Sequence, residues 1–334
     1  MSLELLAIDI GKQSFHVHGV GSNGVVLSRK VGRAKLLELI GHLDPRIVAM
    51  EACASAHHWG RQLEALGRQV RLINPRFVKP FVRGSKNDAI DAEAIYEAAT
   101  RPTMRFVPVK STEQQDLQSL HRVRERLICQ RTSLINHTRG LLAEYGIVLP
   151  RGSSRFTTSA PEAVADAQLS DLARDLFAEL FDQLSDVDER IKTLDARIVA
   201  ICRLNEAARR LAALPGVGPL IATALVASIG DGRRFRSGRQ LAAWIGLVPR
   251  QHTTGGKPRL GGIGKRANHD LRRQMIHGAR AVAFRVSGRD DARSNWLKAL
   301  VERRGFNRAV VALANKTARI AWALLTRSQS HALA

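Results

Sequence analysis

Hydrophobic and polar positions change their period along the chain, and the change predicts where domains begin and end. Short apolar segments bounded by turn residues come first, in the pattern of an antiparallel meander that continues into further strands. The predicted strands cover residues 3–10, 13–20, 24–31, 46–50 and 69–73. Helices at 34–43 and 57–66 separate the later strands. Strands first and alternating helices afterwards predict a mixed sheet covered by helices, hence an α/β domain over residues 1–110.

Two later segments follow a helical period instead. Residues 112–145 contain no proline, and their leucines recur every seven positions at Leu120, Leu127, Leu134 and Leu141. A second heptad run comprises Leu180, Leu184, Val187, Ile191, Leu194, Ile198 and Ile201. Proline and glycine near residue 150 predict a linker at 151–165 between them. We expect a central coiled-coil region at 111–210, paired either within one chain or between two chains.

The carboxy-terminal part, residues 211–334, is predicted to be mainly helical. Residues 214–219 form a glycine turn before an apolar helix. This turn is similar to a helix-hairpin-helix element, in which Gly216 and Gly218 would present backbone N–H groups to a phosphate. The alternative is a plain tight turn between packed helices. A polar, basic, glycine-rich loop follows at 251–259 and leads to a helix starting near His269. Amphipathic helices at 280–326 are expected to supply core.

The net charge of the chain narrows the class of partner that it is expected to bind. The chain has 334 residues and a formal net charge of +22, which favours a polyanion such as nucleic acid. No segment has the roughly 18 consecutive apolar residues that span a bilayer, and no signal sequence is evident, so we expect a cytoplasmic protein with no membrane partner. The three cysteines lack metal-site spacing and are predicted to be buried thiols. Arginines on 112–145 are either a solvated face or a nucleic-acid contact: Arg122, Arg124, Arg126, Arg131 and Arg139.

Four acids stand where a metal site would need them. Asp9 ends the first apolar strand, Glu51 follows the fourth, and Asp88 and Asp91 lie three residues apart in a segment at 87–98 that is predicted to be helical. A carboxylate in a buried strand is costly unless a cation or donor holds it, so acids from three segments indicate one shared Mg²⁺ site. The order of these acids is similar to that of the ribonuclease H-like nucleases, such as the RuvC Holliday-junction resolvases.

Nearly the whole chain resembles the DEDD transposases of bacterial insertion sequences, the one-ten family with its Piv-like DNA invertases. The resemblance rests on the four acids together with Leu-Pro-Gly-Val-Gly at 214–218, Gly-Leu-Val-Pro at 246–249, Thr-Gly-Gly-Lys at 254–257 and Leu-Arg at 271–272. It implies a RuvC-like domain, a coiled coil and a carboxy-terminal transposase domain. It also implies a nucleoid-associated bacterial recombinase that acts on the DNA of its element ends and target.

The resemblance further implies a structured guide RNA encoded by the element, Mg²⁺ held by the four acids, and dimers that assemble into a tetramer. In the family a serine attacks the DNA phosphate. Here the corresponding loop has Thr253 and Thr254, and Gly264 stands where a later serine is frequent. A threonine hydroxyl can serve as a nucleophile, and we expect Thr253 by position, with Thr254 second. Candidate nucleic-acid ligands are Lys257, Arg259, Lys265, Arg266 and Arg272.

Two other functions fit parts of this pattern. A metal-dependent junction resolvase needs the acids and water, and predicts that the threonines are dispensable. A non-catalytic RNA- and DNA-binding protein predicts that all four acids can be replaced without loss of function.

Overall fold

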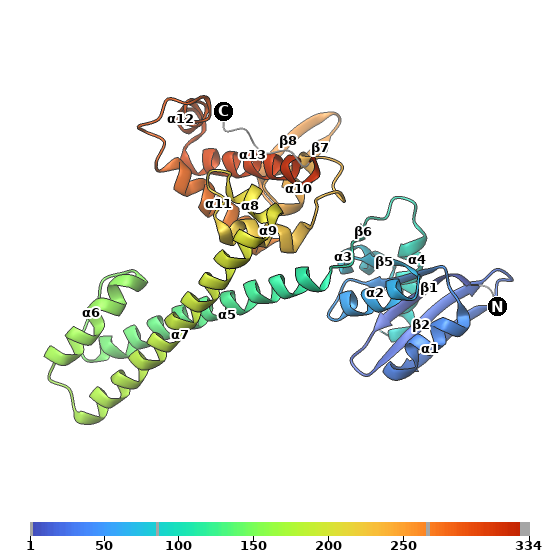
Figure 1. Ribbon diagram of the computed structural model, residues 1–334, viewed down its shortest axis with the longest axis horizontal. Helices are drawn as coiled ribbons and strands as arrows, with labels where there is room; N and C mark the ends of the chain where they lie inside the picture. The colour runs from blue at the N-terminus through green and yellow to red at the C-terminus, as the bar shows by residue number, and fades with distance from the viewer. Residues whose placement is uncertain (1–2, 85–86, 265–267, 328–334) are drawn as a thin grey trace. The chain divides into compact units, whose positions relative to one another are not determined.

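The computed structural model describes residues 3–84, 87–264 and 268–327 (Figure 1). The chain divides into two compact units, residues 1–112 and 113–334. The first unit ends at residue 112, and the sequence predicted an α/β domain over residues 1–110. The second unit combines the helical middle of the chain with the carboxy-terminal helices.

A six-stranded mixed sheet forms the centre of the first unit. Its strands are β1 (Leu3–Ile10), β2 (Ser14–Gly21), β3 (Val26–Gly32), β4 (Ile47–Glu51), β5 (Gln69–Ile73) and β6 (Phe106–Val107). The strand order is β3-β2-β1-β4-β5-β6, antiparallel at both edges and parallel from β1 through β4 to β5. The predicted meander and mixed sheet are confirmed, and the short β6 is an additional strand.

Alternation along the central strands sends side chains to two covered faces. Even-numbered residues such as Ile8 and Met50 pack with α1 (Leu36–Leu43) and α2 (Ala56–Ala65). Odd-numbered residues such as Ala7 and Ala49 pack with α3 (Pro75–Val78) and α4 (Asp88–Thr100). Because both faces are covered, the parallel strands are apolar along most of their length. A polar side chain at an odd position of β4, or of β1 after its irregularity between Leu3 and Leu6, must therefore lie on the α4 face.

Two long helices, α5 (Thr112–Glu144) and α7 (Asp171–Leu204), pack antiparallel within one chain. Together with α6 (Ser153–Asp166) we call them the helical arm. Leu127 packs with Val187 and Ile191. Ion pairs run across the pair, between Arg131 and Asp188 at 3.1 Å and between Arg124 and Asp195. The two pairings step by seven residues in opposite directions, which defines the antiparallel register. The predicted long helices are confirmed, and of the two pairings left open by the sequence the structure has the internal one.

Two details of the arm differ from expectation. Leu141, predicted for the seam, is 38% exposed because the buried stripe runs through Ile135, Thr138 and Leu142 instead. The predicted linker at 151–165 is wrong, since α6 (Ser153–Asp166) is a helix with Pro161 inside it. Its buried residues Phe156, Ala160 and Val164 are four apart and pack against α7. A packed helix, and not a flexible linker, therefore connects α5 to α7.

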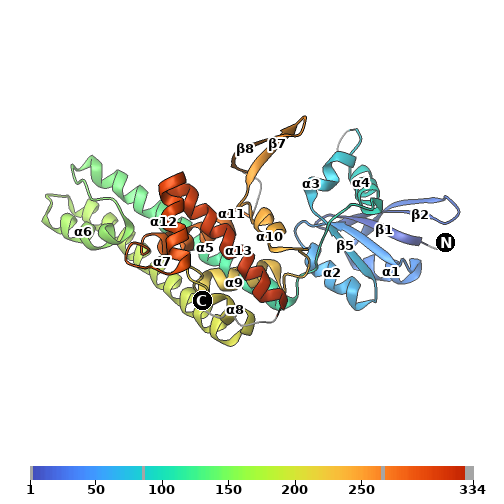
Figure 2. The same ribbon diagram turned by 90° about the horizontal axis from the view of Figure 1, so that it is seen from above.

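The remaining helices of the second unit enclose one apolar core. They are α8 (Glu206–Ala212), α9 (Pro219–Ile229), α10 (Gly238–Ile245), α11 (His269–Ala283), α12 (Ala292–Arg304) and α13 (Phe306–Arg327). A two-stranded hairpin, β7 (Pro249–Thr254) and β8 (Lys257–Ile263), projects from them (Figure 2). None of the helices in the described part of the chain is both long and apolar enough to cross a membrane. Of the three cysteines predicted to be buried, Cys202 is buried and Cys129 is exposed.

The glycine turn before α9 is a packing contact. Gly216 has a φ of +82°, and the Val217 N–H donates to the Leu214 carbonyl at 2.9 Å to close the turn. Gly278 of α11 lies so close that a Cβ on it would stand 1.9 Å from the Gly216 carbonyl oxygen. Close backbone approach between the turn and α11 is thus a sufficient reason for both glycines. Gly218, in contrast, is exposed at the start of α9.

We expect Gly278→Ala to destabilise the protein by about 3 kcal/mol or more, because the added methyl must push two backbones apart. Urea unfolding followed by tryptophan fluorescence measures the change. Gly140→Ala is the matched control, since Gly140 is a helical glycine of α5 with open space around it, and alanine there should stabilise by about 0.5–1 kcal/mol. Equal effects at the two positions would contradict the packing account.

His121 ties the arm to α9 through a hydrogen bond between its Nε2 and the Thr223 Oγ1 at 3.0 Å. Burial, and then the neighbouring Arg124, lower the pKa of His121 from 6.5 to about 4. As the pH falls, the unfolded chain therefore binds a proton near pH 6.5, whereas the folded chain binds it only near pH 4.

Stability should accordingly fall as the pH is lowered through this window, by about 1 kcal/mol after allowance for solvent screening. His121→Gln should flatten the dependence of the melting temperature on pH between 6.5 and 4. His137→Gln, at an exposed position of α5, is the control. An unchanged pH profile in His121→Gln would show that other groups set the acid sensitivity.

Candidate functional site

Two of the predicted acids lie at the ends of neighbouring parallel strands. β1 and β4 pair in a register that matches Ile8 with Met50, so Asp9 and Glu51 are the next positions on adjacent strands, which lie about 4.8 Å apart. Both are odd-numbered and therefore lie on the face that α4 covers. Each is partly buried. Strand pairing alone thus brings two carboxylates together at one end of the sheet.

The other two acids begin the helix on that face. Asn87 caps α4 by accepting from the Ala89 N–H at 3.0 Å, and Asp88 and Asp91 occupy the first turn. Asp91 precedes the buried residues Ile95 and Ala98 on the stripe of α4 that packs on the sheet, and it is partly buried. Asp88, the first helical residue, is exposed. The predicted helix with both acids in one turn is confirmed.

Electrostatics shows that three of these acids are close. Burial raises the pKa of Glu51, and the negative charges of Asp9 and Asp91 raise it further. Among the described residues no lysine or arginine forms a salt bridge with Glu51 or Asp91. The described side chains do not form a group of three or more ligands already arranged around one point. Glu51 and Asp91 are therefore near one another, and no salt bridge with a described lysine or arginine offsets their charges.

The predicted glycine-rich loop at 251–259 is a β-hairpin. Thr254 pairs with Lys257, and Gly255 and Gly256 form the two-residue turn with φ of +57° and +74°. Positive φ at both positions defines the type I′ turn, whose twist matches that of the two strands and which glycine favours. Every residue of both strands is exposed. The cations and hydroxyls of this segment are thus held on a regular, projecting scaffold.

Strand alternation sorts the hairpin residues onto two faces. Thr254 shares a face with its partner Lys257 and with the next pair on that side, His252 and Arg259. Thr253 lies on the opposite face, where its Oγ1 accepts from the Gln251 Nε2 at 2.8 Å. The two cations predicted to hold a phosphate therefore accompany Thr254 and not Thr253.

Arg272 at the start of α11 has a structural partner. Its guanidinium donates to the Gly264 carbonyl oxygen and lies 3.1 Å from the Nδ1 of His269, so it fixes the exit of β8 to α11. Lys265 and Arg266 lie outside the described residues. The nucleic-acid roles predicted for Arg272, Gly216 and Gly218 remain predictions.

A cleft beside Arg272 adds residues that the sequence pattern did not single out. It has a volume of about 510 Å³, and α11 supplies most of its lining. His269, Arg273, His277 and Arg280 follow one another three or four residues apart and so share a face of α11. Arg273 is held by Glu125 of α5 at 2.7 Å. This helical spacing of cations and histidines was the available signal for His277 and Arg280.

Two family models match the two halves of the chain. Residues 6–147, which carry all four acids, match a DEDD transposase model of the IS110 kind. Residues 208–295, which carry the hairpin and α11, match the model described as the transposase IS116/IS110/IS902 family. A mixed α/β half with acids and a helical half with a basic hairpin therefore define a DNA transposase.

Relatives extend this match over the full length. The chain is 51% identical to a probable family 20 transposase of Pseudomonas aeruginosa, over 98% of both chains. It is 46% identical to the transposase for insertion sequence element IS1111A of Coxiella burnetii, over 98% of this chain and 91% of the relative. A pilin gene-inverting protein of Moraxella bovis is 24% identical over 98% of both. The chain belongs to the IS116/IS110/IS902 family of insertion-sequence transposases.

Proposed function

We propose that the protein cuts and rejoins the DNA of its own insertion sequence, with the acids of the first unit as a Mg²⁺ site and a threonine of the hairpin as nucleophile. The observation that supports this most is the occurrence in one chain of two complementary parts. One is a set of acids converging on Glu51, and the other is an exposed hydroxyl accompanied by cations. A nuclease that uses water would not need the second part.

The acids suit a hard divalent cation. Carboxylate oxygens are the ligands that Mg²⁺ prefers, and a bound cation would offset the burial and the repulsion that together raise the pKa of Glu51. Asp9, Glu51 and Asp91 would hold the ion, with exposed Asp88 completing the set from the first turn of α4. When bound, Mg²⁺ supplies positive charge to a phosphoryl oxygen of the DNA.

The hairpin would provide the covalent step. The Oγ1 of Thr254 would attack the DNA phosphorus and give up its hydroxyl proton, the P–O3′ bond would break, and the departing 3′ oxygen would take up a proton. The products are a phosphothreonine-linked 5′ end and a free 3′ hydroxyl. Lys257 and Arg259 on the same face would hold the phosphate and stabilise its charge. Thr253, favoured from sequence position, lies with Gln251 on the other face. The placement of the cations supports Thr254.

A structured guide RNA is the proposed second partner, as the resemblance to the family implies. The net charge of +22 supports a polyanionic partner, and exposed arginines of α5, Arg122 and Arg126, remain after Arg124 and Arg131 have paired within the arm. We also propose that active sites are built between subunits, with the acids of one and the hairpin of another. Both statements extend the transposase assignment.

Sequencing the RNA that copurifies with the protein from its native host tests guidance. One abundant structured species, encoded beside the gene and complementary to the element ends, supports it. Heterogeneous RNA that dissociates at moderate salt would contradict it, because charge alone binds polyanions without selection.

An excision assay on a plasmid that carries the intact element tests the recombinase activity separately. Rejoined donor DNA and circular element are the expected products. Nicked four-way junctions without rejoining would favour the junction resolvase.

A further inference from the structure

The second unit carries a large groove on the side of α13 that faces away from its core. Its volume is about 1380 Å³, and it is bounded by α13, the start of α10 and the base of the β7–β8 hairpin. One face of α13 lines its length through Arg308, Ala312, Lys316, Arg319 and Ala323. A groove of this size bordered by helices is of the kind that accepts an amphipathic helix.

The groove has an apolar floor and a cationic rim. Val311, Ile320 and Trp296 contribute apolar surface, and the Lys316 ammonium lies 4.7 Å from the centre of the Trp296 ring. The rim cations are Arg239, Arg308, Lys316, Arg319 and Arg327, and no acid is among the described residues that line the groove. A phosphate backbone would satisfy the rim but leave the apolar floor uncovered. The better complement is a surface that joins leucines to carboxylates.

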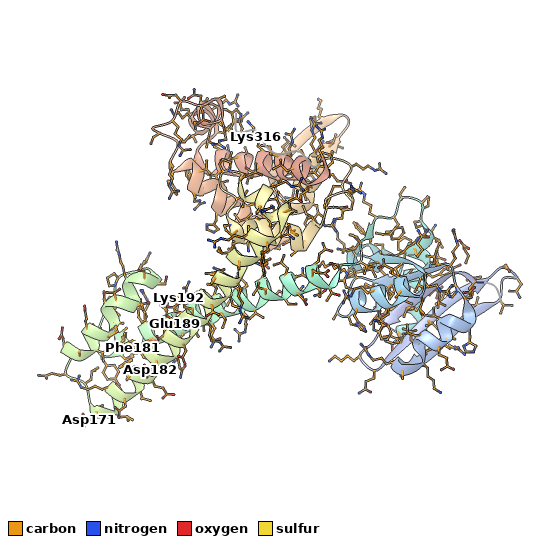
Figure 3. All side chains as sticks on the ribbon, in the orientation of Figure 1. Asp171, Phe181, Asp182, Glu189, Lys192 and Lys316 are labelled. Atoms are coloured by element: carbon orange, nitrogen blue, oxygen red, sulfur yellow. The ribbon has the colours of Figure 1, made fainter. Side chains whose placement is uncertain are left out.

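The far end of the helical arm has such a surface. Between residues 171 and 189 of α7 there are seven acids and one arginine, in a chain of net charge +22. Arg174, the one cation, is bonded to the Ala167 carbonyl at 2.7 Å. Six exposed acids follow one another at spacings of three and four residues: Asp171, Asp175, Glu179, Asp182, Asp186 and Glu189. These spacings place them within about 80° of the helix circumference, as a single stripe. Asp171, Asp182 and Glu189 mark it in Figure 3.

Two large apolar side chains border this stripe and are exposed in the described part of the chain. Leu172 is 69% exposed and Leu176 is 52% exposed. They are four residues apart, so they lie together on the helix, between the acidic stripe and the buried seam. Exposed leucines of this size beside a regular row of acids indicate an interaction surface.

We propose that the Leu172–Leu176 end of the arm docks in the α13 groove of a second copy of this chain, and that the contact is reciprocal between the two copies. The leucines would cover the apolar floor, and Asp171, Asp175 and Glu179 would meet Arg308, Lys316 and Arg319. The groove of the same copy is out of reach. Leu176 lies 28 residues before the end of a continuous helix, which is about 42 Å along its axis from the carboxy-terminal helices.

Charge reversal on each side tests the contact by sedimentation equilibrium of the full-length protein without nucleic acid. The arm variant is Asp171→Lys/Asp175→Lys/Glu179→Lys, and the groove variant is Arg308→Glu/Lys316→Glu/Arg319→Glu. Each alone should weaken dimerisation by about tenfold or more, because like charges then face each other. The control, Glu162→Lys/Asp166→Lys, reverses two exposed acids of α6 outside the stripe and should leave the dimer unchanged.

Mixing the two variants gives the decisive result. In a mixed pair, the lysines of one arm meet the glutamates of the other groove, and the unaltered arm meets the unaltered groove, so both contacts are restored. Dimers should therefore form in the mixture and not in either variant alone. Leu172→Ala/Leu176→Ala should also weaken the dimer, which separates apolar docking from charge attraction.

Three results would overturn the proposal. A wild-type protein that is monomeric at tens of micromolar, or a mixture that stays monomeric, would exclude this contact. A groove variant that keeps the wild-type dimer but loses binding to a DNA or RNA duplex would assign the groove to nucleic acid. None of these measurements depends on recombination, so the outcome is independent of the proposed guide RNA and nucleophile.

Discussion

Asp91→Asn is expected to lower recombination by about a thousandfold or more while the protein stays folded. Asp91 is near enough to raise the pKa of Glu51 by its charge, so it belongs to the converging acids. Asparagine keeps the shape but removes one of the charges that would hold Mg²⁺ and, through it, stabilise the reacting phosphate. Excision of the element from a plasmid, quantified by product amplification, measures the loss.

Melting temperatures distinguish a loss of the metal site in Asp91→Asn from misfolding of the variant. The acids repel one another in the metal-free protein, so Asp91→Asn should leave its melting temperature equal to or slightly above that of the wild type. Added Mg²⁺ should raise the melting temperature of the wild type and have a smaller effect on the variant. Glu93→Gln, at an exposed position of the same helix, should behave as wild type in both assays. Full recombination by Asp91→Asn would exclude the metal-site proposal.

The sheet and its acids could be predicted because two local rules agree there. Apolar runs such as Ile47–Met50 end at polar residues, which locates the strand ends, and alternation assigns Asp9 and Glu51 to one face. Asn87 before an alanine-rich segment gives the start of α4 and thereby places Asp88 and Asp91 in one turn. Each acid is thus located by its own short segment, without knowledge of distant contacts.

Other features depend on tertiary contacts that short patterns do not show. Pro161 and the many serines and threonines of 153–159 weaken the helical signal of α6, yet burial of Phe156 and Ala160 against the arm holds it helical. Leu141 fits a strict heptad but lies outside the seam, because α5 and α7 meet along positions three and four apart that drift around the helix. The groove on α13 is assembled from segments up to 90 residues apart.

The β7–β8 hairpin could be predicted from the sequence only in part. The pair Gly255-Gly256 between polar residues is a known signal for a two-residue turn, but the flanking strands have no apolar alternation to reveal them. Every strand residue is exposed, so no buried face selects hydrophobic side chains. Thr253, Thr254, Lys257 and Arg259, which the sequence grouped in one loop, lie together on this hairpin. Their division between two faces required the strand register.

Thr254→Ala is expected to remove the covalent protein–DNA species, whereas Thr253→Ala should retain it within about threefold of the wild-type rate. The pairing register of β7 with β8 gives the reason for this difference. Thr254 lies beside Lys257 and on the same face as Arg259, while the Thr253 hydroxyl is engaged by Gln251 on the opposite face. A hydroxyl without neighbouring cations would meet the phosphate with its charge uncompensated. Denaturing gels of protein incubated with element-end DNA detect the adduct.

Thr254→Ser refines this prediction. Serine keeps the hydroxyl and loses the methyl that restricts rotation about χ1 and crowds an in-line approach to phosphorus, so adduct formation should be as fast as in wild type or faster. The same change at Thr253 should have no effect. An adduct that survives Thr254→Ala and disappears in Thr253→Ala would reverse the assignment, and would mean that bound DNA turns the hairpin so that its other face meets the acids.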